Sequence, residues 1–157
     1  MIKLIVSEID GVITDGSHPE DEMGNVFYKT YQSKDFDAVN ELKKKYTFIF
    51  LSKDKRVNYN MCQRRNIKFQ SARNEEEKYK TLMDLLRKHN CSPDEVIYIG
   101  SKISDRKCLR LIPKSFCPDD AGQYIKDLCW AHFTTSGGTG ILVELLYLLE
   151  TNALSED

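Results

Sequence analysis

Two carboxylates, Glu8 and Asp10, stand one residue apart just after an apolar segment at 4–6. Leu-Ile-Val in that segment is typical of a buried strand, so both acids are expected at a strand end. Acids at such a position are candidate site residues, because ligands gather at the carboxyl ends of parallel strands. The simpler alternatives are a solvated acid at Glu8 and a turn-capping side chain at Asp10.

A hydroxyl and an ammonium in later segments are further candidate site residues. Ser52 comes directly after the apolar run 46–51, and Lys78 lies near the start of the amphipathic segment 75–90. The structural alternatives are a helix cap for Ser52 and a solvated lysine in a charged run for Lys78.

A third polar group follows the apolar run 96–99. It reads Gly-Ser-Lys-Ile-Ser-Asp over 100–105 and contains Ser101, Lys102 and Asp105. For Asp105 we favour a structural role, the capping of the helix that follows it.

Short apolar segments alternate with amphipathic ones along the chain. Strands are expected at 3–9, 46–51, 67–69 and 96–100, and helices at 35–45, 58–66, 75–90, 104–111, 120–128 and 141–150. Alternation of this kind is typical of an α/β fold with a parallel sheet covered on both faces. Because ligands bind at the carboxyl ends of parallel strands, the residues just after the strands should converge there, namely Glu8, Asp10, Ser52 and 100–105.

The segment between the first strand and the first helix is expected to form a β-hairpin at about 12–30. Its tip is the turn-like Glu20–Asn25, and its strands are Val12-Ile13 and Val26–Tyr28. We treat 1–150 as one domain and 151–157 as a polar tail that frays.

Composition excludes several classes of function. The 23 Lys and Arg balance 24 Asp and Glu, so no charge pattern favours nucleic-acid binding. No apolar run approaches ~18 residues, which argues against a membrane span. The five cysteines form no C-x-x-C pair, so we do not expect a zinc site. We expect their thiols to be reduced, as in a cytoplasmic protein.

Three segments, Gly11–Gly16, Pro118–Ala121 and the glycine-rich Ser136–Gly140, carry a family resemblance together with the expected hairpin. The chain resembles the 3-deoxy-D-manno-octulosonate (Kdo) 8-phosphate phosphatase group of the haloacid dehalogenase (HAD) superfamily over essentially its whole length. The resemblance implies a Rossmann-like α/β fold, with a central parallel sheet, helices on both faces and a β-hairpin in place of a cap domain. The same module forms the C-terminal domain of animal CMP-sialic acid synthetases, where it serves assembly.

The resemblance also implies a chemistry. In this family one aspartate attacks phosphorus, a second acts as acid and base, and a hydroxyl and a lysine hold the phosphoryl group. Mg²⁺ is held by the nucleophile, the main-chain carbonyl of the second aspartate and an acid after the third strand. Carried onto this sequence, the catalytic residues are Glu8, Asp10 and Lys78, the phosphate ligands are Ser52 and Lys78, and Glu8 and Asp10 contribute to the metal site.

Several of these positions depart from the family pattern. Glu8 replaces the attacking aspartate, and its extra methylene moves the attacking oxygen by about 1 Å, a displacement that costs on the order of a hundredfold in rate. Ser101 replaces the metal-ligating acid and Lys102 replaces the next acid. The usual Thr-Gly-Arg is Ser52-Lys53-Asp54, and the arginine before the late Gly-Gly is Ser136. Mg²⁺ sites usually keep one or two carboxylates, so Mg²⁺ binding is doubtful here.

Two hypotheses follow. In the first, the protein hydrolyses a 3-deoxy-octulosonate or nonulosonate (sialic-acid-type) phosphate, and Lys102 partly replaces the missing metal charge. In the second, which we favour because several parts of one site have changed together, the phosphatase fold persists as an oligomeric scaffold or binding module. The resemblance further implies a homotetramer built through the hairpins, a sugar-acid phosphate ligand, and a cytidylyltransferase as a candidate partner.

Overall fold

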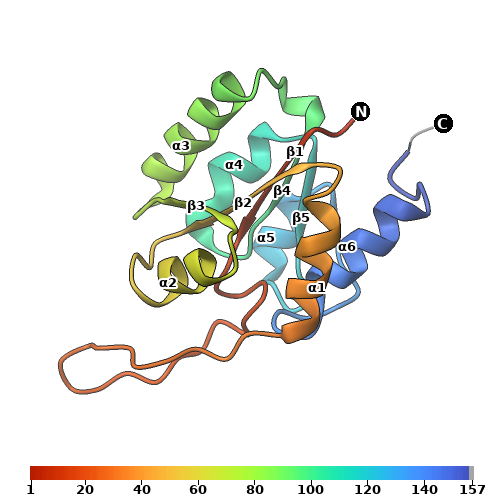
Figure 1. Ribbon diagram of the computed structural model, residues 1–157. Helices are drawn as coiled ribbons and strands as arrows, with labels where there is room; N and C mark the ends of the chain where they lie inside the picture. Colours follow the sequence, from red (N-terminus) through yellow and green to blue (C-terminus); the bar gives the residue numbers. More distant parts are fainter. Residues whose placement is uncertain (156–157) are drawn as a thin grey trace.

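A six-stranded, all-parallel sheet forms the centre of the computed structural model, which describes residues 1–155 (Figure 1). The strand order is β3-β2-β1-β4-β5-β6. The strands are β1 (Leu4–Glu8), β2 (Thr47–Ser52), β3 (Lys68–Ser71), β4 (Val96–Ile99), β5 (Lys114–Cys117) and β6 (Ala131–His132). The helices are α1 (Ser33–Leu42), α2 (Val57–Arg64), α3 (Glu75–Lys88), α4 (Arg106–Leu111), α5 (Gln123–Leu128) and α6 (Ile141–Glu150), with short 3₁₀ turns at Pro93–Glu95 and Ile103–Asp105.

The two faces of the sheet carry separate apolar cores, because successive side chains of a strand point to opposite faces. On β1, Ile5 packs with apolar residues of α1, α2 and α6. Its neighbours Leu4 and Val6 pack with residues of α3, α4 and α5. The result is a three-layer arrangement that confirms the predicted α/β fold with helices on both faces. No helix within 1–155 is long and apolar enough to cross a membrane.

The predicted strands and helices are present, with ends shifted by a few residues, but β5 and β6 were missed. Both are short, and β5 begins with Lys114 and Ser115, which break the apolar pattern. Ser115 is nevertheless buried, and its hydroxyl accepts a hydrogen bond from the Trp130 main chain. Pairing with neighbours, rather than an apolar run, makes this segment a strand.

The connection between β1 and α1 is a hairpin-shaped loop whose two arms project from the body of the molecule (Figure 1). The predicted turn at 20–25 is present, but the predicted hairpin strands are wrong: within 1–155 the only strand-type pairing between the arms is an isolated bridge between Glu20 and Val26. Val12 and Ile13 are instead fully buried, and both their N–H groups donate to the carbonyl of Ile9. Burial of these two side chains in the core outweighs strand pairing in solvent.

The stretch that follows α6 is not frayed over the residues that the structure describes. Leu154 is buried in the core, and its carbonyl accepts a hydrogen bond of 2.9 Å from the ammonium of Lys114. The last part of the predicted tail, 156–157, lies outside the described residues.

Helix α3 carries the candidate site residue Lys78. Asn74 accepts the N–H of Glu77 at the N-terminus, three acids occupy the first turn and basic residues occupy the last, all of which favour a helix here. Lys78 therefore lies one turn into α3, on the face that packs against the sheet, and is buried.

Candidate functional site

A buried polar cluster lies where the carboxyl ends of β1 and β4 approach α3. We call it the inner cluster, and it consists of Glu8, Lys78, Tyr98 and Asp105. The ammonium of Lys78 forms ion pairs with Glu8 and, at 3.1 Å, with Asp105. It also donates to the Ser104 hydroxyl, and the Tyr98 hydroxyl donates to Asp105 at 2.6 Å. Each cluster member is at most 2% exposed.

Burial changes the acidity of this cluster. Desolvation raises the pKa of the Glu8 carboxyl to about 7, the Asp105 carboxylate pushes the pKa the same way, and Lys78 opposes the rise. For Lys78, burial lowers the pKa, but the two carboxylates outweigh it, so the net direction is upward. The alternatives of a solvated acid at Glu8 and a solvated lysine at position 78 are therefore wrong.

Asp105 faces the loop before it rather than the helix after it. Its second carboxylate oxygen accepts the N–H groups of Ser101 and Lys102, both at 3.0 Å. The side chain makes no capping hydrogen bond to α4, so the expected helix cap is wrong. A charged lysine and three further donors satisfy this carboxylate, because an unpaired charge at such depth would be costly.

A second group of charges, the outer cluster, lies between β1 and β2 and consists of Asp10, Lys29, Ser52, Asp54 and Asn58. The Lys29 ammonium lies 2.8 Å from a carboxylate oxygen of Asp10 and 2.8 Å from one of Asp54. The Asn58 amide donates to Asp10 and to the Ser52 hydroxyl, both at 2.9 Å. The Lys29 side chain is 4% exposed, and those of Asp10 and Asp54 are 14% and 22% exposed.

Asp54, not Ser52, holds the start of α2. Its carboxylate accepts the N–H groups of Arg56, Val57 and Asn58. Burial raises the pKa of Asp54, but the Lys29 ammonium and these N–H groups outweigh that effect and hold the pKa below its ordinary value. The helix-cap alternative for Ser52 is therefore wrong, and its hydroxyl faces the outer cluster.

Ser101 connects the two clusters. Its hydroxyl donates to the main-chain carbonyl of Asp10 at 3.4 Å, and its N–H is held by Asp105 of the inner cluster. Gly11 permits this approach: a Cβ there would lie 2.4 Å from the Ser101 oxygen, and the φ of +88° favours glycine. Lys102, by contrast, is exposed, although its charge lowers the pKa of Glu8.

The late glycine-rich segment packs directly on the loop that follows β1. A Cβ on Gly137 would lie 2.1 Å from the main-chain oxygen of Gly11, so only glycine fits. The N–H of Gly138 donates to Val12, and Gln32 donates to the carbonyl of Gly138. The Gly-Gly pair thus supports the backbone that carries Asp10.

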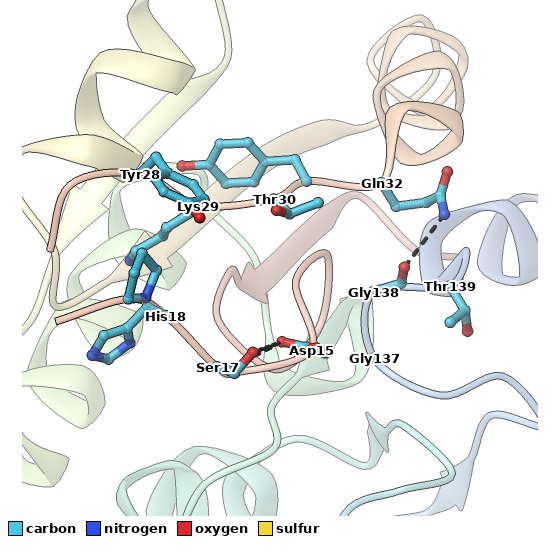
Figure 2. Close-up of a pocket in the computed structure, with 12 residues that line it drawn as sticks. Asp15, Ser17, His18, Tyr28, Lys29, Thr30, Gln32, Gly137, Gly138 and Thr139 are labelled. Atoms are coloured by element: carbon cyan, nitrogen blue, oxygen red, sulfur yellow. Dashed lines mark hydrogen bonds between the residues drawn. The ribbon is translucent and has the colours of Figure 1, made fainter.

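A pocket of about 530 Å³ opens at the base of the projecting loop (Figure 2). It is lined by both arms of the loop and by the glycine-rich segment, through Asp15, Ser17, His18, Pro19, Tyr28, Lys29, Thr30, Tyr31, Gln32, Gly137, Gly138 and Thr139. Asp15 is committed to Ser17, whose N–H and hydroxyl donate to it, an Asx-type turn. Lys29 belongs both to this pocket and to the outer cluster.

The structure brings together the predicted residues Glu8, Lys78 and Asp105 in one cluster, and Asp10 and Ser52 in the other. Lys29 and Asn58, which pair with the predicted residues, were missed. Lys29 lies in a loop whose register no periodic pattern sets, and Asn58 reads as an ordinary polar residue near the start of a helix. Burial of a lysine and an asparagine among carboxylates is visible only in three dimensions.

Comparisons with known proteins reveal structural likeness without close sequence relatives. No protein-family model matches the sequence. No curated protein matches it either. Among solved structures, the cobalt-bound deoxy-D-mannose-octulosonate 8-phosphate phosphatase of Haemophilus influenzae has a TM-score of 0.86 at 24% identity, covering 96% of this chain and 88% of that chain.

Two further structures agree. The Kdo 8-phosphate phosphatase of Moraxella catarrhalis, solved with magnesium, phosphate and Kdo, has a TM-score of 0.85 at 19% identity over 96% of this chain and 86% of that chain. A protein described as a HAD family hydrolase from Streptomyces avermitilis has a TM-score of 0.83 at 23% identity over 92% of this chain and 82% of that chain. The chain therefore has the haloacid dehalogenase fold, in the form seen in the Kdo 8-phosphate phosphatases.

Proposed function

We propose that this protein is a HAD-fold binding or assembly module of the sugar-acid phosphatase type, with little or no phosphatase activity. Fold alone does not decide between an enzyme and a scaffold, so the argument rests on the strand-end residues. The single observation that carries it is the state of the groups that would hold a divalent ion.

Those groups do not suit Mg²⁺. The resemblance assigns the ion to Glu8, the carbonyl of Asp10 and the residue at position 101. Glu8 is buried and paired with Lys78, while the Asp10 carbonyl accepts the hydroxyl of Ser101, a neutral group in place of a carboxylate. Within 1–155, no group of three or more His, Cys, Asp or Glu side chains could hold a metal ion. Mg²⁺ sites usually retain one or two carboxylates, and none here is uncommitted.

The alternative function is an active phosphatase for a 3-deoxy-octulosonate or nonulosonate phosphate. One observation favours it: Glu8, Asp10, Ser52 and Lys78 all lie at the carboxyl ends of β1 and β2 or beside them, as a phosphatase requires. Against it, Glu8 is 1% exposed and would have to leave its ion pair before reaching phosphorus.

A phosphate-release assay decides between the two. The substrates are 3-deoxy-octulosonate 8-phosphate and a nonulosonate 9-phosphate, each with Mg²⁺ and with a chelator. We expect no release above the rate of an Asp10→Asn control. Turnover at 1 s⁻¹ or faster, on the order of the lower limit of ordinary enzymes, would overturn the proposal.

Restoration of the family residues offers a converse test. The variant with Glu8→Asp, Ser101→Asp and Lys102→Asp shortens the acid at position 8, adds acids at 101 and 102, and should acquire Mg²⁺-dependent phosphate release. Its matched control carries the same three changes with Asp10→Asn and should remain inactive. Equal rates in the two variants would count against a decayed phosphatase site.

The assembly role is proposed through the projecting loop. Met23, Phe27 and Tyr28 are exposed on it, and its arms carry main-chain groups outside any sheet. Exposed apolar side chains beside unpaired strand-like backbone favour association with another copy. We therefore propose a homotetramer, with a cytidylyltransferase as a candidate heterologous partner. Light scattering at micromolar concentration should give a tetrameric mass, and Phe27→Ser with Tyr28→Ser should lower it; a monomeric wild type would contradict this role.

A further inference from the structure

A buried lysine from a loop is an unusual partner for two acids at a strand end. Lys29 lies in the second arm of the projecting loop, yet its side chain is 4% exposed. Figure 2 shows this side chain directed away from the arm that carries it. Its ammonium reaches Asp10, which follows β1, and Asp54, which follows β2, at 2.8 Å each.

The position of Lys29 relieves the repulsion between the Asp10 and Asp54 carboxylates. Two carboxylates close to one point repel each other unless a cation lies between them, and the repulsion grows as water is excluded. In a metal-dependent phosphatase, a divalent ion meets a comparable need. Here the ammonium of Lys29 provides a positive charge that is covalently attached to the chain, at an effective concentration that a free ion has to exceed.

The remaining contacts make this pairing part of the folded structure. The Asn58 amide donates to the same Asp10 oxygen that Lys29 contacts. Arg56, at the start of α2, donates to the carbonyl of Val26 on the arm that carries Lys29. The loop is therefore held against the body of the protein at two points, by Lys29 in the outer cluster and by the contact of Arg56 with Val26.

We propose that Lys29 is a tethered cation that occupies the Asp10–Asp54 pair and keeps divalent metal ions from binding between these two carboxylates. The loop then acts as a strap that delivers this charge. The proposal does not depend on whether the site is catalytic: a phosphatase active in the presence of a chelator would overturn the proposed function and leave this inference standing.

The test is a titration of the protein with Mn²⁺ alone. Binding is measured by electron paramagnetic resonance, as the loss of the signal of free Mn²⁺. Wild type should take up no stoichiometric Mn²⁺. Lys29→Met exposes the two carboxylates to solvent ions and should bind Mn²⁺ at least tenfold more tightly than wild type. Lys53→Met is the matched control, since Lys53 is exposed, adjacent to Asp54 and in no ion pair with residues 1–155; it should behave as wild type.

Two further variants show whether the charge of Lys29 is responsible, and the wild-type titration remains a test if Lys29→Met folds poorly. Lys29→Arg retains the charge and should remain without Mn²⁺. Lys29→Met combined with Asp54→Asn removes one charge of each sign, should retain the wild-type circular dichroism spectrum, and should also bind no Mn²⁺. Saturable Mn²⁺ uptake by wild type that Asp10→Asn abolishes would overturn the proposal, as would a folded Lys29→Met variant that binds no better than Lys53→Met.

Discussion

The inner and outer clusters have the same composition at their centres, one lysine between two carboxylates, but they are built from different parts of the fold. The inner cluster draws on β1, β4 and the first turn of α3, and its side chains are almost completely excluded from solvent. The outer cluster draws its lysine from a projecting loop, and its two acids retain 14% and 22% exposure.

This difference indicates that similar ion pairs have different consequences at different depths. Where water is excluded, an unpaired charge is expensive, so the inner cluster is expected to act as a structural lock. Where water remains, the free-energy cost of losing a partner is smaller. The outer cluster is therefore the more solvent-accessible of the two, and the inner cluster is expected to hold the strand ends together.

The largest effect is expected from Lys78→Met. This change leaves the Glu8 and Asp105 carboxyls buried without their ammonium, and breaking a buried pair in this way costs about 3–5 kcal/mol of unfolding free energy. Urea denaturation at neutral pH measures it. Lys80→Met, at an exposed position on the same helix, is the control and should change the unfolding free energy by less than about 0.5 kcal/mol. A loss of unfolding free energy below about 1 kcal/mol for Lys78→Met would contradict the proposal that the deeper cluster contributes more to stability.

A smaller effect is expected in the outer cluster from Asn58→Ala. Asn58 is fully buried, accepts a hydrogen bond from Tyr31 and donates to Asp10 and Ser52. Its loss leaves three partners that water can partly solvate, for a cost of about 1–3 kcal/mol. Asn60→Ala, at an exposed position of the same helix, should cost less, again by urea denaturation. If Asn58→Ala destabilised more than Lys78→Met, the order of the two clusters would be reversed.

The inner cluster should also make stability fall as the pH rises toward neutrality. The pKa of Glu8 is raised to about 7 in the folded protein by burial and by Asp105. The folded state therefore holds a proton that the unfolded state releases at lower pH, and the associated stability is fully present below about 4.5 and lost as the pH rises through about 7. Glu8→Gln removes this titration, so the difference in unfolding free energy between wild type and variant should change across that window. A constant difference would contradict the raised pKa of Glu8 in the folded protein.

The outer cluster should respond in the opposite direction and by the smallest amount. Asp54 has a lowered pKa, because Lys29 and the N–H groups of α2 outweigh its burial. Its contribution to stability is present above the ordinary pKa of aspartate, about 3.9, and is lost as the pH falls below it. Asp54→Asn, which can still cap α2, should lose this acid-side dependence. Parallel denaturation curves for wild type and Asp54→Asn between about pH 5 and pH 2 would contradict the ion pair with Lys29.

Local sequence patterns predicted much of the framework. Apolar runs at β1, β2 and β4, and the amphipathic pattern of α3, indicated a parallel sheet, and the ends of parallel strands share one edge by geometry. That geometry predicted that Glu8, Asp10, Ser52 and residues 100–105 would lie at that edge, and the family resemblance added Lys78. The periodic pattern of apolar residues that marks a strand or a helix is local, so it can be recognised in a single sequence.

The partners of those residues were decided by tertiary structure. Whether Lys78 is solvated or sealed with Glu8 and Asp105 depends on how closely α3 packs on the sheet, which no local pattern specifies. Lys29 reaches Asp10 because an irregular loop folds back over the strand ends, and the expectation of a regular hairpin gave no reason to look there. Electrostatic pairing acts between residues far apart in the chain, and only the folded arrangement determines which charges are close enough, and dry enough, to matter.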